Sequence, residues 1–253
     1  MTAPLPTFLI IGAQKSATRW LRRNLGRHPD VFAAEYELSF FDGRRWDLGV
    51  DWYRAQFEGW SGEPVVGEST PGYMVGRTGP DEVARRIDET LPGVQLLAIL
   101  RNPVDRATSA LVHHVRRERI RPDVRLVDVL RARPVEEDPL ALVAAGRYAA
   151  CLEPFRARVG DRLLVLLHDD VAVDPVHVYE RARAHVGAAA GFVPPELDEV
   201  VYSNQADAGE RYALTPDERA ELFEYFRDDV AELERAFGLD CSRWRPDRAA
   251  AVA

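Results

Sequence analysis

The chain has 253 residues, of which 46% are hydrophobic and 29% are charged, so it holds enough apolar material for a sizeable core. Its formal net charge of -8 excludes attraction to nucleic acid or to an anionic membrane through overall charge, and any anion site must be local. The N-terminal stretch MTAPLPTFLIIG lacks a basic region, and its apolar run is too short for a signal peptide or a bilayer span. We therefore expect a cytoplasmic protein. Cys151 and Cys241 share no metal-type spacing with histidine and are interpreted as reduced packing residues.

Lys15 is the only lysine in the chain, against 32 arginines. The preference for arginine and alanine is typical of a GC-rich bacterial genome. Two interpretations of the single lysine remain open. It is either an accident of this bias, or it marks a site that needs a compact ammonium on a flexible stem, which a planar guanidinium cannot imitate.

Strand and helix patterns alternate along the chain. Short apolar runs that end in polar residues predict buried strands over 8–12, 64–70, 94–101 and 161–170. Helical periodicity covers the stretch from Ser16 to the sequence HPD, and then 80–91, 103–118, 174–187 and 214–239. In the last of these, Thr215 and Glu218 form a capping box. The pattern predicts a single α/β domain over 1–253, with a parallel sheet between helices and a disordered tail over 245–253.

Ligands of such sheets bind at the carboxyl ends of the strands, so the loop after the first strand is a candidate site. The loop reads GAQKSAT over 12–18, between a buried strand and a helix. It is shorter than the G-x-x-x-x-G-K-[ST] loop of nucleotide triphosphatases and lacks the second glycine. A kinase or ATPase is therefore disfavoured, whereas binding of a phosphate at the helix N-terminus is retained. An ordinary strand-to-helix turn stays an equal alternative.

Two other segments carry candidate site residues. Arg101 ends a predicted strand, and Ser109 follows two turns into the next helix, so the pair offers donors for a second phosphate. The alternative is that Arg101 pairs with Asp105 while the serine faces solvent. In the sequence AAEYELSFFDG over 33–43, Glu37 stands beside a phenylalanine pair, which partly desolvates a carboxylate and suits it to accept a proton. A charge at the rim of an aromatic core is the alternative there.

Together these segments resemble the sulfotransferases that use 3′-phosphoadenosine 5′-phosphosulfate (PAPS), and most closely their heparan-sulfate branch. The likeness lies in four segments in the right order and covers most of the chain. Residues 10–32 resemble the family's 5′-phosphosulfate loop, and ELSFFD over 37–42 resembles its glutamate-bearing segment. GESTPGYM over 67–74 resembles the next strand-end motif, and 96–114 resembles the 3′-phosphate motif. The expected fold is then the P-loop-like sulfotransferase fold.

The resemblance implies in-line transfer of a sulfuryl group from PAPS to an acceptor hydroxyl, with release of adenosine 3′,5′-bisphosphate and no metal. It implies that Lys15 stabilises the leaving oxygen and that Glu37 takes the acceptor's proton. Arg101 and Ser109 would bind the 3′-phosphate. His113, one turn after Ser109, is either a second acid or base or a helix-surface histidine. The remaining donor contacts implied are Ser16, Ala17, Thr18, Arg19 and Trp20 in the first loop and helix, and Gly209 and Arg211 in a late loop.

The sequence also departs from the family's pattern. Ser69 stands where the family often has a lysine, and the late loop has lost its lysine, which makes a polyanionic acceptor a poor match. We expect a small or glycosylated hydroxyl acceptor, such as a glycosylated or phenolic natural product, and neither nucleic acid nor membrane as a partner. Tyr36, Phe40, Trp46, Trp52 and Tyr53 either line its pocket or belong to the core. The alternative function is a small-molecule kinase using ATP and Mg²⁺, with Glu68 or Asp169 as the metal-binding carboxylate.

Overall fold

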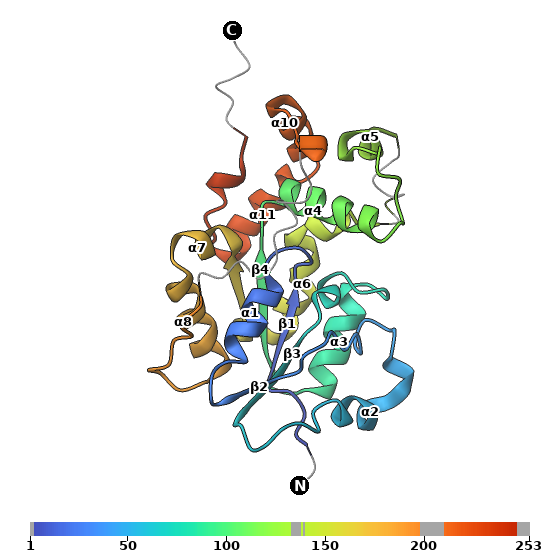
Figure 1. Cartoon of the computed structure of the whole chain (residues 1–253). Helices are drawn as coiled ribbons and strands as arrows, with labels where there is room; N and C mark the ends of the chain where they lie inside the picture. The colour runs from blue at the N-terminus through green and yellow to red at the C-terminus, as the bar shows by residue number, and fades with distance from the viewer. Residues whose placement is uncertain (1–2, 133–137, 139, 198–209, 247–253) are drawn as a thin grey trace. The chain divides into compact units, whose positions relative to one another are not determined.

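The computed structural model describes residues 3–132, 138, 140–197 and 210–246 (Figure 1). Contacts divide the chain into two compact units. Unit 1 comprises Met1–Leu100 and Cys151–Val201, and unit 2 comprises Arg101–Ala150 and Tyr202–Ala253. The predicted single domain stays a prediction, and the predicted tail over 245–253 lies outside the described residues from 247 onward.

Unit 1 is an α/β unit built on a five-stranded, all-parallel sheet, as the sequence predicts. The strand order is β2-β3-β1-β4-β5. The strands are β1 (Phe8–Gly12), β2 (Val31–Ala33), β3 (Val65–Ser69), β4 (Gln95–Leu100) and β5 (Leu163–Leu167). The α-helices are α1 (Thr18–Leu25), α2 (Gly49–Ala55), α3 (Pro80–Thr90), α6 (Tyr148–Val159, which begins in unit 2), α7 (His168–Val173) and α8 (Pro175–Val186). Short 3₁₀ helices are η1 (Trp46–Leu48), η2 (Pro71–Met74) and η5 (Gly160–Arg162).

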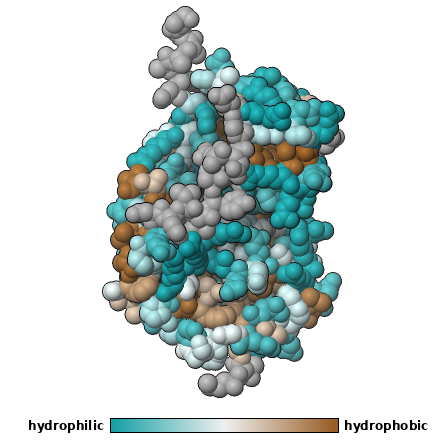
Figure 2. All heavy atoms as spheres, in the orientation of Figure 1, coloured by the Kyte–Doolittle hydropathy of each residue, from teal (hydrophilic) through white to brown (hydrophobic). Residues whose placement is uncertain are grey.

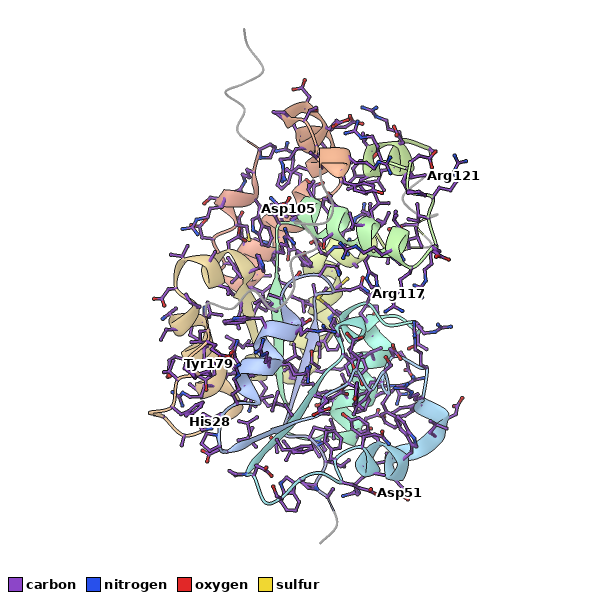
Figure 3. The ribbon with its side chains drawn as sticks, viewed as in Figure 1. His28, Asp51, Asp105, Arg117, Arg121 and Tyr179 are labelled. Carbon is purple, nitrogen blue, oxygen red and sulfur yellow. The ribbon has the colours of Figure 1, made fainter. Side chains whose placement is uncertain are left out.

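The central strand β1 is buried on both faces, which explains its wholly apolar sequence. One face of the sheet packs against α1 and α8, where Phe8 and Ile10 meet Trp20, Leu21 and Tyr179. In Figure 1, α3 lies on the other side of the sheet from these two helices. Figure 3 labels Tyr179 on α8, and this side chain is fully buried in that layer. The layer holds α1, and hence the loop before it, firmly against the sheet.

Unit 2 is helical. Its elements are α4 (Pro103–Arg116), α5 (Leu126–Ala132), η4 (Ala144–Gly146), η6 (Glu210–Tyr212), α10 (Pro216–Glu224), α11 (Arg227–Phe237) and η7 (Ser242–Trp244). The helix α4 packs against α5, η4 and α10. The predicted capping box is confirmed, because Thr215 accepts the backbone N–H of Glu218 and the glutamate side chain accepts that of Thr215. Both cysteines are free and buried, as expected.

Two predicted elements differ from the structure. The single helix expected over 214–239 is two helices, because a turn at Tyr225 and Phe226 interrupts it, with a φ of -119° at Phe226. Two aspartates in the first turn of α11 favour a new helix start there. The strand expected over 161–170 ends at Leu167, and its acidic end begins α7 instead.

The surface is mostly hydrophilic on the face that Figure 2 shows, with separate small apolar patches. The exposed large apolar side chains are Tyr36, Leu48, Val173, Val176 and Val193. Within the described ranges, no helix is long and apolar enough to cross a bilayer.

Candidate active site

The loop after β1 turns sharply into α1. Lys15 and Ala17 adopt left-handed backbone conformations, with φ of 71° and 69°. Such turns point successive N–H groups into one concavity, which suits an anion. Gly12 is required by close packing, since a Cβ there would lie 2.8 Å from the Cβ of Met74. The loop is therefore compact and held against η2.

The start of α1 has the properties of an anion site. Its first turn contains no acidic residue, and no side chain caps it. The first N–H groups of a helix have no partner within the helix. Ser16 is fully buried, and its hydroxyl has no hydrogen-bond partner in the part of the chain that is described. A buried hydroxyl beside the N–H groups of a helix start fits the oxygens of a phosphate.

The other residues predicted in this segment differ in their exposure to solvent. Lys15 is half-buried, Thr18 is buried and Arg19 is exposed. The indole of Trp20 is a core group, because its Nε1 donates to the carbonyl of Leu197 at 2.9 Å. Trp20 can therefore contribute only its backbone N–H to a ligand.

Glu37 lies on the loop between β2 and η1, near the start of α1. Desolvation raises the pKa of its carboxyl, whereas the positive charges of Arg19, Arg22 and Arg44 oppose this rise. Glu37 is nevertheless exposed to solvent, so the desolvation is partial. The N–H of Ser39, two residues after Glu37, donates to the hydroxyl of Thr70 at 3.2 Å, so the loop that carries Glu37 lies at the end of β3. A raised pKa and solvent access are what a general base requires.

The strand order brings these two loops to the same edge of the sheet. The strands β1 and β3 pair in parallel, with Ile10 opposite Ser69, and the N–H of Thr70 donates to the carbonyl of Ile10 at 3.1 Å. The residues at the end of β3 therefore lie next to the start of the anion loop. The structure thus brings Lys15, Ser16 and Glu37 into one region of unit 1.

Glu68, at the end of β3, is fully buried. Desolvation raises its pKa to about 6, although hydrogen bonds from Tyr73, Thr70 and Tyr53 oppose the rise. Because these hydroxyls occupy its oxygens, the carboxylate is poorly disposed to hold Mg²⁺ as the kinase alternative requires. The second carboxylate of that alternative, Asp169, lies in α7. In the described ranges, no group of three or more His, Cys, Asp or Glu side chains is arranged to hold a metal ion.

The remaining predicted donor contacts belong to unit 2. Arg101 precedes α4 and is half-buried, and no hydrogen bond or ion pair engages its guanidinium among the described residues. The alternative pairing with Asp105 is not observed, because Asp105, labelled in Figure 3, pairs with Arg219 at 2.5 Å. Ser109 is buried on α4, so the alternative of a serine facing solvent is wrong. An unengaged guanidinium fits the second phosphate of the donor.

Three further candidates end up in different environments. His113 lies one turn after Ser109 on α4 and is half-buried, with its ring 5.9 Å from that of His114. Arg211 in η6 is exposed, and its guanidinium donates to the carbonyl of Pro122 at 3.4 Å. Gly209 lies outside the described residues. The roles of these residues stay predictions.

The aromatic cluster divides between core and surface. Phe40 and Tyr53 are fully buried and stack with ring centroids 4.5 Å apart, so they belong to the core and do not line an acceptor pocket. Trp46 and Trp52 are half-buried, each beneath an arginine. Tyr36, next to Glu37, is 76% exposed and remains available to an acceptor.

Sequence reasoning missed the residues that surround Glu68. Tyr53, Thr70 and Tyr73 donate to its carboxylate, and Arg45 donates to the backbone of the Glu37 loop. Tyr53 stands 15 residues away from Glu68 in the chain, and Thr70 and Tyr73 lie in a motif that resembles the family without showing what they contact. No local sequence pattern predicts that these residues surround Glu68.

No family model matches this chain. It is 33% identical over 188 residues to heparan sulfate glucosamine 3-O-sulfotransferase 3B1 of Homo sapiens, which covers 72% of this chain and 46% of that protein. The chain spans less than half the length of the curated relatives that it matches. A crystal structure of a sulfotransferase from Alicyclobacillus acidocaldarius is 30% identical and aligns over 96% of this chain and 99% of that one, with a TM-score of 0.79. The chain belongs to the sulfotransferase family.

Other sulfotransferases share the fold at greater distance. The mouse sulfotransferase SULT7A1, solved in complex with PAP, aligns over 94% of this chain and 91% of its own, with 14% identity and a TM-score of 0.54. The resemblance drawn from the four sequence segments is thereby confirmed at the level of family and fold. The parallel sheet expected of a sulfotransferase is the sheet found in unit 1.

Proposed function

We propose that this sulfotransferase moves a sulfuryl group from PAPS to a hydroxyl of an acceptor and releases adenosine 3′,5′-bisphosphate. The observation that carries the proposal is the arrangement at the β1–β3 edge. The buried hydroxyl of Ser16 has no hydrogen-bond partner among the described residues, and the first turn of the helix that follows contains no acidic residue. The loop that carries Glu37 lies nearby, and the pKa of the Glu37 carboxyl is raised. This combines an anion site with a proton acceptor, as the transfer requires.

In the proposed reaction, the backbone N–H groups of Ser16 to Arg19 and the hydroxyls of Ser16 and Thr18 bind the 5′-phosphate. The acceptor oxygen forms a bond to sulfur as the bond from sulfur to the bridging oxygen breaks. Glu37 takes the acceptor's proton, and the bridging oxygen leaves with the electron pair. The ammonium of Lys15 stabilises the charge that develops on this oxygen, as a compact point charge can.

The second phosphate of the donor distinguishes it from ATP. We propose that Arg101 and Ser109 bind this 3′-phosphate, that Gly209 and Arg211 contribute to the late loop, and that His113 is a second acid or base. The guanidinium of Arg101, which no described residue engages, and the burial of Ser109 support this assignment.

We propose a small or glycosylated hydroxyl compound as the acceptor, such as a natural product of a bacterial cytoplasm. The overall charge of -8 and Ser69 in place of a lysine disfavour a polyanion. The exposed ring of Tyr36 beside Glu37 offers a surface on which a sugar or phenol ring can stack.

Calorimetry tests the donor assignment. We expect adenosine 3′,5′-bisphosphate to bind without metal, and Arg101→Ala to weaken this binding by about 10- to 100-fold, because a charge-assisted contact is lost. The matched control is Arg121→Ala, which removes an arginine that pairs with Asp123 on the surface of the same unit. Binding of ATP with Mg²⁺ but not of the bisphosphate would overturn the donor assignment in favour of the kinase alternative.

A turnover assay of Lys15→Arg tests the role of the single lysine. We expect a large loss of turnover in a folded protein that still binds the bisphosphate, because the guanidinium fork is shaped for two oxygens rather than one. Near-normal turnover would mean that the lysine is an accident of composition.

A further inference from the structure

The buried carboxylate of Glu68, at the end of β3, accepts several hydrogen bonds. It accepts from the hydroxyl of Tyr73 at 2.6 Å, from that of Thr70 at 2.7 Å and from that of Tyr53 at 3.1 Å. A buried carboxylate is costly unless such donors satisfy it, and an apolar side chain would fill the same space at a lower cost. The position therefore calls for an explanation beyond packing.

Two of these hydroxyls also hold the loop that carries Glu37. The oxygen of Thr70 accepts the backbone N–H of Ser39 at 3.2 Å, and the oxygen of Tyr73 accepts that of Phe40 at 3.0 Å. Two consecutive backbone amides are thus linked to one carboxylate, each through a single hydroxyl. They belong to the second and third residues after Glu37.

The loop is also held by its carbonyl groups, and its backbone needs this support. The guanidinium of Arg45 donates to the carbonyl of Leu38 at 2.5 Å and to that of Glu37 at 3.4 Å. Ser39 has a φ of 48°, a left-handed conformation that is unfavourable for a residue other than glycine. Such a conformation persists only where the surroundings impose it, and it is often found at functional sites.

We propose that Glu68 is a positioning residue for the transfer reaction, whose carboxylate, through Thr70 and Tyr73, fixes the backbone of residues 39–40 and thereby the direction of Glu37. This inference rests on the proposed role of Glu37 as the base. An active-site group must be held within a fraction of an ångström of its productive position by such supporting contacts. Glu68 acts on the reaction only through this loop.

The charge of Glu68 sets the direction of every hydrogen bond in the cluster. An ionised carboxylate only accepts, so the hydroxyl hydrogens of Thr70 and Tyr73 point toward it. Their oxygen lone pairs are then free to accept the loop amides. A glutamine at position 68 brings an NH₂ donor, which competes with those amides for the hydroxyl oxygens. Glu68→Gln therefore keeps the volume of the side chain and removes the directionality.

The experiment compares two tyrosines that donate to the same carboxylate oxygen. Tyr73→Phe removes a hydroxyl that bridges Glu68 to the loop. Tyr53→Phe removes a hydroxyl that donates to Glu68 but accepts no loop amide among the described hydrogen bonds. Both rings are buried and both are retained. We expect Tyr73→Phe, Thr70→Val and Glu68→Gln each to lower kcat by about 10- to 100-fold, the effect of misplacing a reacting group by about 1 Å.

Two further readouts separate positioning from general loss of structure. Binding of adenosine 3′,5′-bisphosphate should change little in Tyr73→Phe. Both Tyr73→Phe and Tyr53→Phe should lower the thermal midpoint, because each removes a buried donor to the same carboxylate oxygen, but Tyr53→Phe should lower kcat much less. In a Glu37→Gln background, Tyr73→Phe should cause no further loss of residual turnover, because its effect passes through Glu37. Should Glu68→Gln fail to fold, the two hydroxyl deletions carry the test.

The outcomes distinguish this inference from the proposed function. Full turnover in Glu37→Gln would overturn the role of Glu37 as the base and the positioning inference that rests on it, whereas the sulfuryl transfer itself would stand. Loss of turnover in Glu37→Gln together with equal effects of Tyr73→Phe and Tyr53→Phe would overturn the positioning role alone. An additional loss from Tyr73→Phe in the Glu37→Gln background would overturn it as well.

Discussion

The buried carboxylate of Glu68 should make the stability of this sulfotransferase depend on pH in an unusual direction. Burial raises the pKa of Glu68 to about 6 in the folded chain, against an ordinary value of 4.5. The folded state therefore binds this proton more tightly than the unfolded state does. The resulting contribution to stability is fully present below pH 4.5 and is lost as the pH rises through 6.

The magnitude follows from the two pKa values. A difference of about 1.5 units corresponds to about 2 kcal/mol in full. Of this, about 1.2 kcal/mol develops between about pH 7.5 and pH 5.0, because the unfolded-state carboxyl begins to titrate only near the lower end of that range. Most paired carboxylates act in the opposite direction and stabilise proteins at higher pH, so the sign is diagnostic.

The assay is urea unfolding of the wild type and of Glu68→Gln at both pH values. The quantity of interest is the difference in unfolding free energy between the two proteins, since titration of all other groups is common to both and cancels. We expect this difference to shift in favour of the wild type by about 1 kcal/mol on acidification. A constant difference, or a shift in favour of the variant, would show that the hydrogen bonds to Glu68 outweigh its desolvation and would refute the reasoning.

Three further predictions concern other parts of the chain. Burial raises the pKa of Glu37, and a base must be ionised, so kcat/KM should fall with decreasing pH at a midpoint above 4.5. A midpoint at or below 4.5 in the pH–rate profile would contradict the role of Glu37 as the base. Thr215→Ala should lower the unfolding free energy by about 1 kcal/mol in a denaturant titration, because the N–H of Glu218 at the start of α10 loses its acceptor; an unchanged midpoint would mean that water replaces the cap. Gly67→Ala should prevent normal folding, as judged by circular dichroism, since its Cβ would lie 2.3 Å from the ring of Phe8 in the centre of the sheet; a wild-type thermal midpoint would show that β1 and β3 can separate.

Local patterns in the sequence were sufficient to predict the parallel sheet and the candidate anion loop over 12–18. A wholly apolar run that stops at glycine, followed by a helix without an acidic first turn, needs only neighbouring residues to be recognised. The capping box at Thr215 has the same local origin. The three-residue strand β2 escaped prediction because so short a strand, with two of its residues only half-buried, has no periodicity to detect.

The tertiary structure alone decided how Glu37 is held. Nothing in the sequence ELSFFD shows that two successive amides are linked to Glu68, because the hydroxyls that connect them come from residues 31 and 33 positions further along the chain. The same holds for Tyr53 and Phe40, whose stacking assigns them to the core rather than to an acceptor pocket. Composition and spacing determine which residues are available and which elements form. Which residues are buried, and in which direction their hydrogen bonds point, is decided only when β1 and β3 pair. This pairing brings distant segments of the chain to one edge of the sheet.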